Sequence, residues 1–198
     1  MKAPADPIAL AVAAAVMLCW FLFAGIFIFR KRQPRAEHQQ CDNTSRTGVL
    51  ITGGGYAAVW FLQRPFFTPI LVMPRPLELG IGLLTVAIAV WSVWLVLAAV
   101  RTLGRQWKVV AGLVEGHQLI TAGPYRIVRH PIYTGMLGMM LATGLVVSVW
   151  YALPIALALG WTGTVIRVRS EERLLREAFG ERYAEYAKKV PALFPRVL

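Results

Sequence analysis

The residues best suited to chemistry in this chain lie in one segment, Gly123 to Tyr133, which reads Gly-Pro-Tyr-Arg-Ile-Val-Arg-His-Pro-Ile-Tyr. The segment places two arginines, one histidine and two tyrosines between strongly apolar stretches. Arginine and histidine can donate hydrogen bonds to anions, histidine can also exchange a proton, and an aromatic face attracts cations. Ionisable residues beside membrane-length apolar runs are kept where protein or a watery cavity surrounds them, so this segment is a candidate site.

A second group of charged residues, Arg167 to Glu172, follows the last apolar run. Arg167 and Glu171 are four residues apart, so on one helix they share a face and can flank one cavity. The guanidinium fork of Arg167 matches the two oxygens of a carboxylate and could orient an acidic ligand. The alternative is an arginine at the membrane edge that pairs with Glu171 or extends to lipid headgroups.

Composition indicates that membrane helices must position these polar segments. The chain has 198 residues, of which 57% are hydrophobic and only 16% charged, and its mean hydropathy of +0.57 is far above that of soluble proteins. We therefore expect one all-α, polytopic integral membrane domain over residues 1–198. Uncharged runs long enough to cross a bilayer, together with shorter apolar stretches, predict five spans. These spans are residues 7–29, 47–62, 79–100, 132–150 and 151–168.

The positive charges predict the orientation of these spans. Eighteen of the 21 lysines and arginines fall after spans one, three and five, and the other three are Lys2, Arg64 and Arg75. The positive-inside rule then places the N-terminus outside and the C-terminus in the cytoplasm, in the cell inner membrane if the host is bacterial. The formal charge of +11 fits contact with anionic lipid better than nucleic-acid binding, because no nucleic-acid motif accompanies it.

Two polar segments are expected on the cytoplasmic side. Glycine, proline and turn residues predict an ordered loop before span four. After span five, apolar residues recur at helical spacing from Leu174 to Tyr186 and predict an amphipathic helix, with a bend where Phe179 meets Gly180. Two interpretations of this helix remain open, one as a membrane-surface helix and one as a lid over the site.

No metal site is predicted. The three histidines, His38, His117 and His130, are too scattered for a metal-ligand pattern. Cys19 lies within the first span and Cys41 in the loop after it, so neither belongs to a metal cluster.

The C-terminal half of the chain resembles a known family. Over about residues 103 to 195, it is similar to the isoprenylcysteine carboxyl methyltransferases, which are small membrane enzymes. The motifs that carry this similarity are Gly123-Pro-Tyr, Arg-His-Pro-x-Tyr133, Glu171-Glu172, Phe-Gly-x-x-Tyr-x-x-Tyr186 and Val-Pro191. The wider set includes phospholipid N-methyltransferases, and membrane sterol reductases share a related pattern. The resemblance implies S-adenosylmethionine as cofactor, held by segments at about 103–133 and 167–195.

The resemblance also assigns roles to individual residues. It implies that Arg167 faces the acceptor and orients its carboxylate. One departure is Val109-Val110, which stands where relatives can offer a polar side chain to the cofactor. The residues implied to hold the cofactor are His117, Gln118, Leu119, Ile120, Tyr125, His130, Pro131, Ile132, Tyr133 and Glu171.

The chemistry of the residues agrees with this transfer. S-adenosylmethionine carries a sulfonium, an ammonium and a carboxylate, so Glu171 can meet a cation and tyrosine faces can contact the sulfonium or adenine. The start of span four, at His130, offers a ring donor and unpaired helix amides to the methionine carboxylate. A carboxylate acceptor needs no base at neutral pH, whereas an amine or thiol would pass a proton to His117, His130, Glu172 or water.

The expected function is methyl transfer to a lipophilic acceptor that enters from the bilayer between helices. A prenylcysteine-type carboxylate is the favoured acceptor, and a phospholipid amine or a thiol is the alternative. Two further alternatives are a sterol-type reductase with a nicotinamide cofactor and a non-catalytic membrane adaptor. The adaptor would explain the basic face but not why Tyr125, His130, Tyr133, Arg167 and Glu171 occur together.

Overall fold

The computed structural model describes residues 6–29, 43–65, 68, 74–104 and 118–195. These residues form α-helices and one short 3-10 helix, with no β-strand among them, so the all-α prediction is confirmed. The helices are α1 (Pro7–Ile28), α2 (Asn43–Phe61), α3 (Arg75–Leu103), α4 (Pro131–Val147), α5 (Ala152–Phe179) and α6 (Glu181–Lys189), and the 3-10 helix is η2 (Gly123–Arg126).

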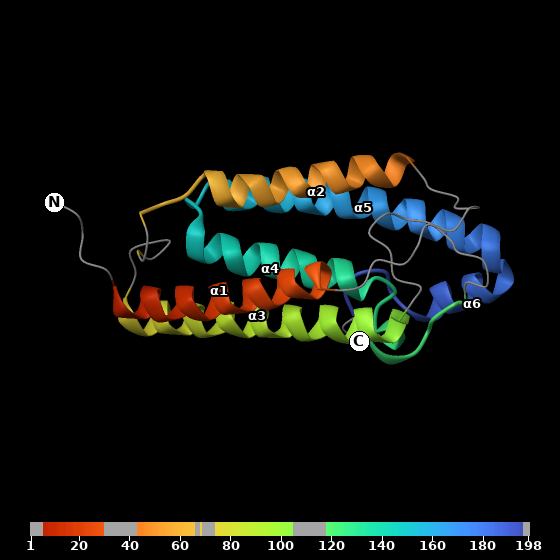
Figure 1. Cartoon of the computed structure of the whole chain (residues 1–198), viewed down its shortest axis with the longest axis horizontal. Helices are drawn as coiled ribbons and strands as arrows, with labels where there is room; N and C mark the ends of the chain where they lie inside the picture. Colours follow the sequence, from red (N-terminus) through yellow and green to blue (C-terminus); the bar gives the residue numbers. More distant parts are fainter. Residues whose placement is uncertain (1–5, 30–42, 66–67, 69–73, 105–117, 196–198) are drawn as a thin grey trace.

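The helices form an elongated bundle of two pairs with α4 between them (Figure 1). α1 lies along α3, α2 lies along α5, and α4 contacts helices of both pairs. Where α1, α3 and α4 meet, the fully buried side chains of Val16, Ala89, Val96 and Met139 form the main apolar core. η2 and α6 both lie at the end of the bundle where α3 and α5 terminate, so the two predicted polar segments meet there.

The membrane-length helices agree in part with the predicted spans. α1 and α3 are long and apolar enough to cross a bilayer, and α4 is a shorter apolar helix. Large apolar side chains such as Leu18 and Leu83 are exposed on the outside of the bundle, as expected where lipid replaces water. The prediction of five spans goes beyond this finding.

Proline begins three of the helices and glycine ends two. Proline stands in the first turn of α1, α3 and α4, where its missing N–H would be unsatisfied in any case. α3 and α5 each end at a glycine of positive φ, which is 55° at Gly104 and 51° at Gly180. The predicted bend after Phe179 is therefore confirmed, and α6 turns back there.

α5 is one helix from Ala152 to Phe179, so it continues through the predicted end of span five at residue 168. It packs against α2 with the backbones in contact at Gly48 and Gly163. A Cβ atom added to Gly163 would lie 2.6 Å from the carbonyl oxygen of Gly48 and 2.4 Å from Thr52 Oγ1, so only glycine fits. Arg167 follows Gly163 by one helical turn, and this contact fixes its height along α2.

A tight hairpin connects α4 to α5. Arg64, which follows α2, donates hydrogen bonds to the carbonyls of Leu145 (2.9 Å) and Ser148 (2.7 Å). These are carbonyls that the end of α4 leaves without a helical partner, so one guanidinium caps the helix. Burial lowers the pKa of Arg64 to about 10, so it keeps its charge at neutral pH.

Candidate functional site

The polar segment that precedes α4 is an ordered turn. Gly123, with φ of 58°, begins η2, and Tyr125 is a buried residue within η2. The chain then reaches His130, whose carbonyl accepts the N–H groups of Tyr133 and Thr134 in the first turn of α4. The segment therefore delivers a histidine and a tyrosine to the start of α4, facing α5.

His130 lies between two carboxylates of α5. Its Nδ1 atom is 3.3 Å from Oε2 of Glu171, and its Nε2 atom is 3.3 Å from Oε1 of Glu172. The imidazole is buried and stacks on the Tyr133 ring, with the ring centres 5.7 Å apart and the planes at 15°. Both ring nitrogens thus face a carboxylate oxygen.

These contacts shift the ionisation of all three groups. Burial alone would lower the pKa of His130, but hydrogen bonds and charge from Glu171 and Glu172 outweigh it, and the pKa is raised. Burial opposes ionisation of the two carboxyls, but the His130 ring offsets it and lowers the pKa of Glu171. With His130 and Arg129 as donors, the pKa of Glu172 falls from 4.5 to about 2.

Arg167 and Glu171 meet on the ring of Tyr133. The guanidinium carbon of Arg167 lies 4.3 Å from the ring centre, and the Tyr133 hydroxyl donates a hydrogen bond to Oε1 of Glu171. The Glu171 side chain is 26% exposed, whereas that of His130 is 4% exposed. The carboxylate is therefore the accessible member of a cluster that holds a cation, an anion and an aromatic face.

Arg129 ties the C-terminal segment to this cluster. Its side chain donates to Oε1 of Glu172 from Nε (3.0 Å) and Nη2 (2.6 Å), and to the carbonyls of Ala187 and Val190. The backbone N–H groups of Arg129 and His130 donate to the carbonyls of Pro191 and Ala192, at 2.8 and 2.9 Å. The residues after α6 are thereby held along the start of α4.

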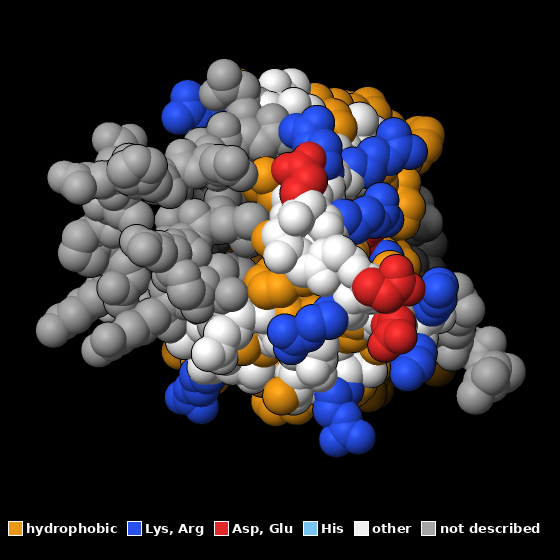
Figure 2. Space-filling model, turned by 90° about the vertical axis from the view of Figure 1, so that its right-hand side faces the viewer, with side chains coloured by type: hydrophobic (Ala, Val, Ile, Leu, Met, Phe, Trp, Pro, Cys, Tyr) orange, Lys and Arg blue, Asp and Glu red, His pale blue; other side chains and the backbone are white. Residues whose placement is uncertain are grey.

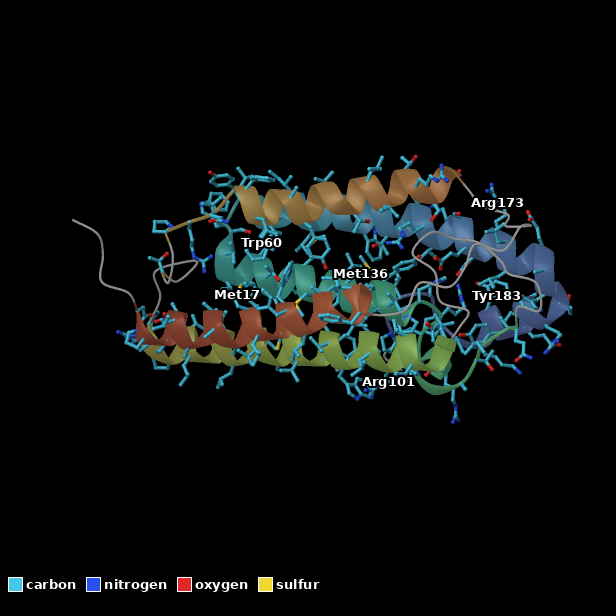
Figure 3. The ribbon with its side chains drawn as sticks, in the orientation of Figure 1. Met17, Trp60, Arg101, Met136, Arg173 and Tyr183 are labelled. Atoms are coloured by element: carbon cyan, nitrogen blue, oxygen red, sulfur yellow. The ribbon has the colours of Figure 1, made fainter. Side chains whose placement is uncertain are left out.

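The C-terminal segment then continues along α5. Leu193 packs against Tyr133 and Val168, with Met136 beside them, and its carbonyl accepts a hydrogen bond from the Thr134 hydroxyl at 2.6 Å. Phe194 stacks on Trp161 of α5, with ring centres 6.0 Å apart. Figure 3 shows Met136 in the middle of the bundle and Tyr183 inside the turn between α5 and α6. The segment therefore covers the α4–α5 contact next to Tyr133.

Most of the predicted site residues lie at this end of the bundle, but not all of them join the cluster. His130, Tyr133, Arg167 and Glu171 are in direct contact, as described above. Pro131 is buried as the first residue of α4. Ile132 packs instead against the apolar core formed by α1, α3 and α4, so its side chain lies outside the cluster.

The remaining predicted residues precede η2 in the sequence, except Tyr125, which lies within it. Gln118 is exposed, and Leu119 and Ile120 are half-buried in an irregular segment. Tyr125 is buried, and its carbonyl accepts a hydrogen bond from the Tyr186 hydroxyl of α6 at 2.6 Å. His117 and Val109-Val110 lie outside the described residues. The cofactor roles of all these residues stay predictions.

The sequence did not indicate that Arg129 and Glu172 form a part-buried ion pair at the site. Glu172 stood out as a member of the family pattern and as a possible proton acceptor. The signal was present as two adjacent pairs, Arg129-His130 and Glu171-Glu172, because a turn that presents one member of each pair also brings its neighbour close.

Comparisons with known proteins identify the family of this chain. Residues 79–182, which include η2, α4 and all of α5, match the phospholipid methyltransferase family. A probable protein-S-isoprenylcysteine O-methyltransferase of Oryza sativa subsp. indica is 31% identical over 191 residues, covering 92% of this chain and 98% of the relative. This second match spans nearly the whole of both proteins.

Other relatives carry different names. The cobalt-zinc-cadmium resistance protein CzcN of Cupriavidus metallidurans is 36% identical over 129 residues, which are 62% of this chain and 51% of that protein. A delta(14)-sterol reductase of Mus musculus is 31% identical over 159 residues, 73% of this chain and 37% of the reductase. The matched segments thus span about half and about a third of these two proteins.

The family match covers more than half of the chain, and the rice relative aligns with nearly all of it. Both include the Arg-His-Pro-x-Tyr segment and the paired glutamates of α5. The chain belongs to the phospholipid methyltransferase family, a group of membrane methyltransferases that includes relatives named protein-S-isoprenylcysteine O-methyltransferases.

Proposed function

We propose that this protein transfers a methyl group from S-adenosylmethionine to a lipophilic acceptor whose reactive group is a carboxylate of the prenylcysteine type. The observation that carries the proposal is the meeting of Arg167 and Glu171 on the Tyr133 ring. This arrangement places one cation and one accessible anion on the same aromatic side chain. A site for a zwitterionic sulfonium and an anionic acceptor needs these groups.

The side chains fit the cofactor's charges. Glu171 would meet its ammonium or sulfonium, the Tyr133 face would contact a cation or the adenine, and His130 with the first turn of α4 would favour its carboxylate. When bound, S-adenosylmethionine supplies an electrophilic methyl group on sulfur. Tyr125, Pro131, Ile132 and the segment from His117 to Ile120 are the further cofactor residues that the family resemblance implies.

Arg167 would orient the acceptor. A carboxylate is already ionised at pH 7, so the protein has to align it and exclude water without removing a proton. Charge is neutralised as such an anion meets a sulfonium methyl group, so a pocket poor in water favours the transfer. The buried guanidinium of Arg167, fixed beside α2 and Tyr133, would hold the carboxylate in one orientation.

The proposed layout has five membrane spans, with the N-terminus outside and the α6 end in the cytoplasm. Support comes from the apolar helices α1, α3 and α4 and from the charged side chains that surround the α6 end (Figure 2). The acceptor would approach laterally from the bilayer, and the soluble cofactor from the cytoplasm. The names of the isoprenylcysteine methyltransferase relatives support the acceptor class. A phospholipid amine or a thiol remains the alternative acceptor.

The test begins with ligand binding. Purified protein, folded in detergent, is titrated with S-adenosylmethionine by calorimetry, and a reduced nicotinamide dinucleotide is titrated in parallel. We expect saturable binding of the first ligand alone. Binding of the nicotinamide cofactor alone would replace the methyltransferase by a sterol-type reductase, and binding of neither would favour the adaptor.

A second measurement identifies the acceptor. Transfer of a labelled methyl group is screened against prenylcysteine analogues, lipids with primary amine headgroups and small thiols. Preferential labelling of the prenylcysteine carboxylate supports the proposal. Labelling restricted to an amine or a thiol would keep the methyltransferase and reject the carboxylate acceptor.

A further inference from the structure

We propose that Glu172 is a positioning residue that keeps both ring nitrogens of His130 protonated, so that His130 is a fixed cation of the site and not a base. The inference concerns residues that the proposed function uses, and only its chemical consequence rests on that function. It follows from the arrangement of His130 between the two carboxylates of α5.

The distances favour an imidazolium. Nδ1 and Nε2 of His130 each lie 3.3 Å from a carboxylate oxygen, one from Glu171 and one from Glu172. An ionised carboxylate can only accept hydrogen bonds, and neutral imidazole has a single N–H. A neutral ring would therefore turn one lone pair toward a carboxylate oxygen. The doubly protonated ring donates to both carboxylates and removes this repulsion.

The other charged groups around the ring allow this assignment. Arg129, from the same segment, donates to the Oε1 atom of Glu172 that also faces the ring, and Arg176, from α5, donates to Oε2. Tyr133 of α4 stacks on the ring through its aromatic face. The raised pKa of His130, which outweighs the effect of burial, agrees with a stable positive charge.

The two carboxylates have unequal surroundings. Glu172 has a 10% exposed side chain and receives hydrogen bonds from Arg129 and Arg176. Glu171 is 26% exposed and receives the Tyr133 hydroxyl. Glu172 therefore fixes the ring from the protein interior. The Nδ1 atom of the ring instead faces Glu171, which is the more exposed of the two carboxylates.

This assignment has a chemical consequence for the proposed methyl transfer. A protonated His130 cannot accept the proton that an amine or a thiol must lose before attack. An acceptor that reaches this cluster must be ionised already or lose its proton to a different group. The arrangement therefore favours an acceptor that is anionic at neutral pH, such as a carboxylate.

The experiment measures the titration of His130 directly. The full chain contains three histidines, His38, His117 and His130, so ring-labelled histidine gives a small set of NMR signals. The His130 signal is assigned by its loss in His130→Gln. We expect its pKa above 6.5 in the wild-type protein and lower by about one unit or more in Glu172→Gln. Glu177→Gln, which removes an exposed carboxylate of the same helix, is the matched control.

Either of two outcomes overturns the inference. Wild-type His130 that titrates at or below the ordinary histidine pKa is not held as an imidazolium. A raised pKa that stays unchanged in Glu172→Gln removes the role of Glu172. If that variant does not fold, the wild-type titration still decides the charge of the ring, and Glu172→Asp tests its partner. The measurement needs neither cofactor nor acceptor, so failed methyl transfer would leave the result valid.

Discussion

The guanidinium carbon of Arg167 lies 4.3 Å from the centre of the Tyr133 ring, so α4 and α5 contribute one residue each to a cation–π pair at the site. The same tyrosine donates its hydroxyl to Glu171, one helical turn after Arg167. Tyr133 therefore fixes the spacing between the group that would hold the acceptor and the group that would hold the cofactor.

Removal of the Tyr133 hydroxyl tests the cofactor side of this arrangement. Tyr133→Phe keeps the ring under Arg167 but leaves one oxygen of Glu171 without its donor. We expect the Kd for S-adenosylmethionine to rise about tenfold, the loss of one hydrogen bond to a charged group. Calorimetry measures the change. Tyr151→Phe, at an exposed tyrosine in the turn before α5, should leave the Kd unchanged, and equal effects of both variants would contradict the role of Tyr133.

Arg167→Lys tests the acceptor side. Lysine keeps the charge but loses the fork that binds both carboxylate oxygens, so kcat/KM for a prenylcysteine carboxylate should fall about 100-fold. The Kd for the cofactor should change by less than about threefold, because the cationic charge beside Tyr133 remains. Parallel kinetics and calorimetry separate the two effects. A similar loss of cofactor affinity would instead assign Arg167 to the cofactor side.

The pH dependence of stability follows from the shifted groups. The pKa of Glu172 is lowered from 4.5 to about 2 in the folded protein, so its contribution is present above pH 4.5 and is lost as the pH falls toward 2. The pKa of His130 is raised above 6.5, so its contribution is complete below pH 6.5 and is lost as the pH rises through the folded value. These two groups together favour a maximum between about pH 4.5 and 6.5.

Thermal unfolding in detergent across this range checks the expectation. Glu172→Gln should reduce the fall in Tm as the pH drops below 4.5, because the variant lacks the carboxylate whose protonation destabilises the folded protein. An unchanged acid limb in the variant would show that other carboxyls govern acid unfolding.

The contact between α2 and α5 gives a prediction about stability alone. Gly163→Ala should lower the free energy of unfolding by about 1 to 3 kcal/mol, because its Cβ would lie 2.6 Å from the Gly48 carbonyl oxygen. Gly53 lies on α2, as Gly48 does, but a Cβ atom added there meets no atom within 4 Å. Gly53→Ala should therefore be neutral or stabilising by up to about 1 kcal/mol. Denaturation of both variants in detergent compares them. Equal stability would mean that the two helices separate without cost.

Hydropathy and turn residues predicted the helices well, because apolar length and the positions of proline and glycine are properties of the sequence itself. The end of span five was predicted as a membrane boundary beyond which the chain continues as a helix. Hydropathy falls at Arg167, but charge does not end a helix, so α5 continues until Gly180 supplies the positive φ. The predicted membrane boundary is therefore not a boundary of secondary structure.

The site could be predicted only where its residues are close in sequence. The four-residue spacing of Arg167 and Glu171 correctly indicated a shared face. The contact of His130 with Glu172 joins residues 42 apart and depends on how α4 packs on α5. Ile132 shows the same limit. It precedes Tyr133 by one residue, and a rotation of about 100° per helical residue turns it to a different, core-facing side of α4.

The unbroken course of α5 gives the site a fixed depth. A helix of 28 residues is about 42 Å long, and its contact with α2 at Gly163 is about 12 Å below Glu171 along the helix axis. The reactive groups therefore stand at a constant height above the part of the bundle that packs as apolar helices. We expect the protein to select acceptors by the distance between their reactive head group and their apolar chain. The shape of the apolar chain should matter less.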